Sequence, residues 1–75
     1  MLVRCMEAEF RGLAVKERDK KKVYNANFED CMSNPFSLYL GESYDAVRHL
    51  NKGDICNLLL DFNTRYNSIK LIEVE

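Results

Sequence analysis

Hydrophobic and polar residues alternate along most of the chain with a period of two, the pattern that indicates β-strands half-buried in a sheet. The alternation predicts five strands, which we place at Leu2–Val15, Val23–Met32, Phe36–Leu40, Ile55–Phe62 and Ser68–Val74. One segment differs: in Glu42–Leu50, a Ser43 cap and apolar residues at a spacing of three predict a short helix. The pattern therefore predicts a mainly β chain with one short helix between strands three and four.

The first segment has two interpretations. Met6 to Glu9 are good helix formers, so a helix is the alternative. As a strand, the segment changes phase at Gly12, and a glycine at a phase change is typical of a β-bulge or sharp bend. We favour one long, bent strand; the residues that would then share a face are Leu2, Met6, Ala8 and Phe10.

The core is predicted from the fourth strand, which is the most hydrophobic stretch of the chain. Residues at alternate positions of a strand point to the same face. We expect an inward-facing set made of Leu58, Leu60 and Phe62 with Leu38, Leu40 and either Ile69 or Leu71.

The 75 residues leave room for one domain, residues 1–75, without internal repeats or linkers. With 47% hydrophobic and 31% charged residues, the composition is that of a chain that folds. No apolar run approaches the roughly 20 residues of a membrane span, and the N-terminal residues do not resemble a signal peptide. We therefore expect a cytoplasmic protein that does not enter a membrane.

Candidate chemistry for catalysis or metal binding is sparse. Cys5, Cys31 and Cys56 are widely spaced, which favours reduced thiols; a zinc site with His49 is the alternative, although structural zinc sites usually use close pairs of ligands. No phosphate-binding glycine loop or hydrolase motif is present. We expect no cofactor, no metal, no small-molecule substrate and no enzymatic activity, with His49 as an exposed surface residue.

The element order is that of the OB-fold, a five-stranded Greek-key barrel. Residues 36–74 carry a further likeness: the run Phe36–Leu40, Gly53 before a hydrophobic strand, the polar turn at residues 63–67 and a final Leu/Ile strand. In these features the chain resembles small single-stranded DNA-binding proteins of the filamentous-phage type. The resemblance implies a phage or mobile-element protein that binds single-stranded DNA along strands two and three, between the loops that join strands one to two and four to five.

Both of those loops combine cations with an aromatic residue. Single-stranded nucleic acid requires cations for its phosphates and aromatic faces for its bases. The candidate nucleic-acid-binding residues are Lys16, Arg18, Lys20, Lys21, Lys22, Tyr24, Tyr39, Arg65 and Tyr66. Tyr39 is expected to point outward, whereas Tyr24 shares the parity of Phe28 and would be exposed only by a bulge. The alternative for the charged run is a solvated hairpin without a ligand.

The net charge of −1 gives no long-range attraction for a polyanion, so any basic surface has to be local. Nucleic-acid binding then requires that the carboxylates lie away from the groove; those at issue are Glu29, Asp30, Glu42, Asp45 and Asp61. The competing hypothesis is a protein-interaction or assembly module on the same barrel. The sparsely charged last strand, Ser68–Val74, additionally predicts a homodimer.

Overall fold

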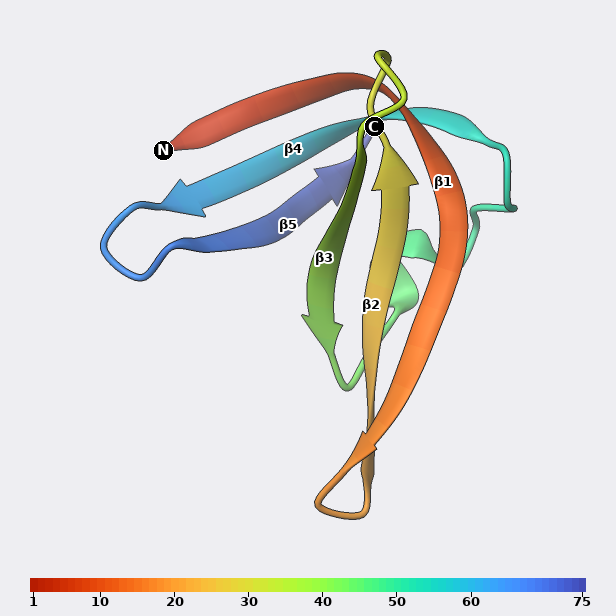
Figure 1. The fold of residues 1–75 in the computed structure, drawn as a ribbon, viewed down its shortest axis with the longest axis vertical. Helices are drawn as coiled ribbons and strands as arrows, with labels where there is room; N and C mark the ends of the chain where they lie inside the picture. Colours follow the sequence, from red (N-terminus) through yellow and green to blue (C-terminus); the bar gives the residue numbers. More distant parts are fainter.

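Five antiparallel strands form a single sheet in the computed structural model, which describes residues 1–75 (Figure 1). The strands are β1 (Leu2–Arg18), β2 (Lys21–Glu29), β3 (Pro35–Gly41), β4 (Ile55–Asn63) and β5 (Ser68–Val74). Their order across the sheet is β3-β2-β1-β4-β5, so β3 and β5 are the edges. The two edges contact each other without pairing, and the sheet is therefore open. The mainly β chain with five strands is confirmed.

Strand β1 is shared by two arms of the sheet. Its first half, Leu2–Glu9, pairs with β4, and its second half, Glu9–Arg18, pairs with β2. Figure 1 shows β1 curving so that the β4–β5 arm and the β2–β3 arm diverge. The predicted bulge at Gly12 is confirmed: Phe10 lies opposite Phe28 and Gly12 opposite Asn27, which leaves Arg11 as the extra residue.

A second bulge in β1 makes part of the predicted face wrong. Cys5 lies opposite Leu58 and Ala8 opposite Cys56, so two residues of β1 oppose one of β4. Glu7 takes a φ of 55° there, and its N–H donates to Oδ1 of Asn57 at 3.0 Å. Because of this extra residue, the residues before the bulge point to the opposite face from the one that strict alternation predicts. Leu2 and Met6, predicted to face the core with Ala8 and Phe10, are 63% and 55% exposed.

The predicted helix at residues 42–50 is also wrong in extent and type. Only one 3₁₀ turn forms, η1 (Asp45–Val47), although Ser43 Oγ accepts the Asp45 N–H at 3.3 Å. Val47 is buried against the sheet and holds this segment in place. No helix of the structure is long and apolar enough to cross a membrane.

Strand β2 ends at Glu29, three residues before the predicted end, because Asp30 closes a turn. Its Oδ1 accepts the backbone N–H groups of Met32 and Asn34, each at 2.9 Å. These bonds, foremost the one from Asn34, hold the pKa of Asp30 below its usual value because they favour the charged carboxylate. The turn sends the chain back antiparallel as β3.

The core lies on the concave side of the sheet, between the two arms. Nine buried residues form it, namely Ala8, Phe10, Ala26, Phe28, Leu38, Val47, Cys56, Leu58 and Leu60. Phe28 is central, with ring centroids 5.4 Å from Phe10 and 5.7 Å from Phe36. Leu38, Leu58 and Leu60 are buried as predicted. The other predicted members, Leu40, Phe62 and Leu71, are half-buried against this cluster, and Ile69 is 41% exposed.

Gly12 provides a test of the bulge. Its φ of 110° is open to glycine but strained for an L-residue, and a Cβ there would meet no atom within 4 Å. We expect Gly12→Ala to lower the free energy of unfolding by about 1–2 kcal/mol through backbone strain alone. Urea denaturation measures this effect. Chemical synthesis with D-alanine at position 12 is the control, because a D-residue favours positive φ; equal losses for both alanines would contradict the explanation.

Candidate nucleic-acid interface

The predicted basic loop is a β-hairpin whose charged residues lie mostly within β1 and β2. The turn consists of Asp19 and Lys20, with φ of 51° and 64°, the left-handed pair that suits a two-residue hairpin. Arg18 lies opposite Lys21, and Glu17 opposite Lys22. Residues directly opposite share a face, so the outer face holds Lys16, Arg18 and Lys21, whereas Lys22 lies beside Glu17 on the face that continues the core.

Tyr39 lies on the same outer face as those three cations. It pairs with Asn25 of β2, and the next outward pair is Ser37 with Asn27, whose side chains are hydrogen-bonded at 2.6 Å. The Tyr39 side chain is 57% exposed, as predicted. Its Cε2 atom would lie 4.0 Å from a Cβ at Gly41, so the ring leans along β3 over this glycine. The ring is therefore accessible at the surface.

Tyr24 lies on the opposite face of the sheet. It pairs with Val15 and is half-buried, with its ring centroid 4.8 Å from that of Tyr44. The Arg48 guanidinium in turn lies 5.2 Å above the Tyr44 ring. The structure therefore separates Tyr24 from Tyr39 and gives Tyr24 a packing role.

The β4–β5 turn carries Arg65 and Tyr66 at the end of the other arm, away from the β1–β2 hairpin (Figure 1). Asn63 Oδ1 accepts the Arg65 N–H at 3.0 Å, and the Arg65 guanidinium lies 5.5 Å from the centre of the Tyr66 ring. Tyr66 is 69% exposed. The two predicted loops are thus both accessible, but they lie at the ends of different arms.

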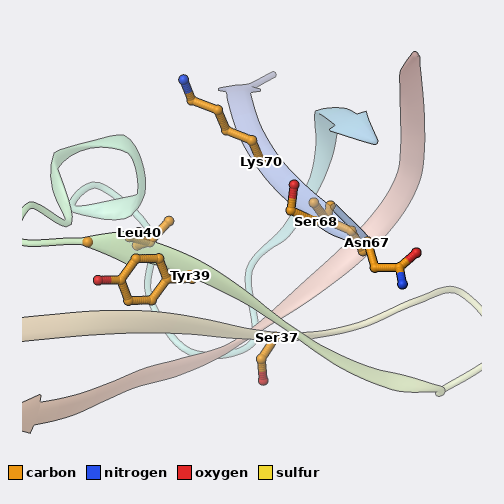
Figure 2. A pocket seen from close by; sticks show the side chains of 8 residues that line it. Ser37, Tyr39, Leu40, Asn67, Ser68 and Lys70 are labelled. Atoms are coloured by element: carbon orange, nitrogen blue, oxygen red, sulfur yellow. The ribbon is translucent and has the colours of Figure 1, made fainter. Parts of the chain in front are cut away.

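An open cleft of about 590 Å³ lies between the edge strands β3 and β5. Figure 2 shows Tyr39 and Leu40 on one side of it and Ser68 and Lys70 on the other. Its lining is completed by Ser37, Gly41, Asn67 and Ile69, and it contains no carboxylate. Lys70 is not among the residues predicted from the sequence, although the alternation of β5 places it outward between Ile69 and Leu71.

The carboxylates gather elsewhere. A second cleft is lined by Glu7, Glu9, Glu29 and Asp30. Glu29 lies four residues along β2 from the partner of Tyr39, about 13 Å away at strand spacing. The other three carboxylates at issue form exposed ion pairs: Glu42 with Lys21 at 3.5 Å, Asp45 with Arg48 at 2.6 Å and Asp61 with the terminal amine at 2.9 Å. Glu29 thus lies on the same face of β2 as Asn25 but at the far end of the strand, and Glu42 is the one of the five that pairs with a cation of the basic face.

The cysteines do not form a metal centre. All three are free thiols, and no group of three or more His, Cys, Asp or Glu residues is arranged to hold a metal ion. Burial raises the pKa of both Cys5 and Cys56, with smaller contributions from nearby Asp30 and Asp54 respectively. These two thiols are therefore protonated at neutral pH, which makes them poor nucleophiles. His49 is exposed, as expected.

The chain matches no protein-family model, and it has no match among curated proteins or solved structures.

Proposed function

We propose that this protein binds single-stranded nucleic acid, with single-stranded DNA as its first candidate ligand, on the outer face of β1, β2 and β3, and that it has no catalytic role. One observation carries the proposal. The exposed Tyr39 ring shares a face with Lys16, Arg18 and Lys21, while four carboxylates gather at the other end of the β1–β2 pair. Stacking and phosphate neutralisation are the two interactions that single-strand binding requires.

The same proposal includes an OB-type barrel. In the strand order β3-β2-β1-β4-β5 with every neighbour antiparallel, β3 and β5 run in the same direction, and these two edges already contact each other. The OB-type barrel is a partly open one, and the unpaired edges β3 and β5 would form its open side. The strand order and the edge contact support this arrangement.

The hairpin offers a matched test, because its cations are divided between two faces. Lys16→Ala with Arg18→Ala removes two charges from the Tyr39 face, whereas Lys20→Ala with Lys22→Ala removes two from the turn and the other face. For a single strand, each lost phosphate contact lowers the slope of log K against log salt by about 0.7. We expect the first variant to lower it by about 1.4 and the second by less, in fluorescence-anisotropy titrations of labelled oligonucleotides at several salt concentrations.

Equal effects of the two double variants would show that the hairpin acts through net charge, without a preferred face. That result would rule out the proposed binding site on the outer face. Circular dichroism of both variants controls for folding, which should be unaffected because all four side chains are exposed.

A protein-assembly role is the second candidate, and a specific observation favours it. Strand β5 is an open edge that carries Ile69 and Ile72, 41% and 46% exposed. Such an edge can pair with a strand of another molecule, and a second copy of the chain is the simplest partner. We expect a homodimer in sedimentation equilibrium at micromolar concentration, and a single species of 8.8 kDa would contradict this expectation.

A further inference from the structure

The cleft between β3 and β5 brings together an aromatic ring and a cation from strands that are far apart in the sequence. Tyr39 lies on its β3 side and Lys70 on its β5 side (Figure 2). The Lys70 side chain is exposed and forms no ion pair. The carboxylate opposite it across the sheet, Asp61, is bound to the terminal amine at 2.9 Å. Lys70 is therefore available to an external anion.

The cleft also suits a nucleotide in size and polarity. Its volume of about 590 Å³ lies within the range of small-ligand clefts, about 300–1,000 Å³. The polar residues Ser37, Asn67 and Ser68 are among those that line it. Because β3 and β5 are edge strands, each also has backbone N–H and C=O groups along one side without a sheet partner. Such groups can donate to and accept from the edges of a base.

We propose that the β3–β5 cleft holds one nucleotide of the bound strand, with its base against Tyr39 and its phosphate against Lys70. This inference rests on the proposed function and extends the site from the β1–β3 face to β5. The cleft lies between the β1–β2 hairpin and the β4–β5 turn, so a strand that crosses it passes from one predicted loop toward the other (Figure 1). The cleft thereby links two loops that would otherwise be separate sites.

The test compares Lys70→Ala with Lys52→Ala. Lys52 is also an exposed lysine without an ion pair, in the turn before β4 and outside every cleft, so both variants lose the same charge. We take the contribution of one phosphate contact to follow a salt slope of about 0.7 and to disappear at 1 M salt. Loss of that contact then lowers the affinity about eightfold at 50 mM salt and about threefold at 200 mM salt. We expect these losses for Lys70→Ala with an oligo(dT) probe, almost none for Lys52→Ala, and recovery in Lys70→Arg.

A second measurement locates the probe without mutation. Titration of the isotope-labelled protein with oligo(dT) should shift the backbone amide resonances of residues 37–41 and 67–70 together. If the unmutated protein binds the probe but Lys70→Ala and Lys52→Ala behave alike and residues 67–70 do not shift, the cleft inference is overturned and the proposed function stands. If the unmutated protein does not bind at all, the proposed function itself fails.

Discussion

Leu58→Ala is expected to lower the free energy of unfolding by about 2–5 kcal/mol, the range for removing a buried leucine side chain. Leu58 is fully buried at the centre of β4, opposite Cys5 on one side and Val74 on the other. Small domains have a total stability of only about 5–15 kcal/mol, and a chain of 75 residues has a thin core. The variant should therefore unfold at a much lower temperature, or be unfolded at 37 °C.

Leu59→Ala is the matched control, because the next residue of β4 points to the other face and is only half-buried. The same atoms are removed from the same strand, so the difference between the two variants measures burial. Thermal melts followed by circular dichroism suffice. Equal losses at positions 58 and 59 would mean that the inward face of β4 has been assigned incorrectly.

Tyr39→Ala is expected to weaken single-strand binding by about 1–3 kcal/mol, which corresponds to roughly 5- to 150-fold in affinity. The ring is exposed and outside the core, so the loss should come without loss of stability. Stacking releases no counterions, and the salt slope should stay nearly unchanged. Anisotropy titrations at two salt concentrations measure both quantities.

Tyr39→Phe keeps the ring and should retain most of the affinity. Tyr24→Ala is the opposite case, because Tyr24 packs against Tyr44. This substitution should lower the free energy of unfolding by more than it weakens the free energy of binding of the protein that remains folded. Were Tyr39→Ala to bind as well as the unmutated protein, Tyr39 would be an ordinary exposed neighbour on a half-exposed sheet.

The sequence predicts the fold best where alternation runs without interruption. The inward positions Leu38, Leu58 and Leu60 were predicted from parity, and Gly12 marked the first bulge. The second bulge has no such marker, because a glutamate, Glu7, adopts the positive φ and a side chain fifty residues away, Asn57, satisfies its N–H. The local alternation of hydrophobic and polar residues does not reveal a contact of this range. For that reason Leu2 and Met6 were assigned to the wrong face.

The orientation of individual residues of the candidate site was predictable from the sequence, but their arrangement on one surface was not. Parity predicted that Tyr39 points outward and that Tyr24 does not. The division of the hairpin cations between two faces depends on the register of β1 against β2, and the cleft depends on how closely β3 approaches β5. Lys70 comes to lie across the cleft from Tyr39 only through that approach, so the sequence alone offered no reason to group them.

Single-strand binding itself is measured by titrating the unmutated protein against labelled single-stranded DNA, single-stranded RNA and duplex DNA at 50 and 200 mM salt. We predict saturable binding to single strands that is tighter than binding to duplex and that weakens as salt rises, because phosphate contacts release counterions. No binding to either single strand at low salt with tens of micromolar protein would contradict the account and leave the assembly role as the function to pursue.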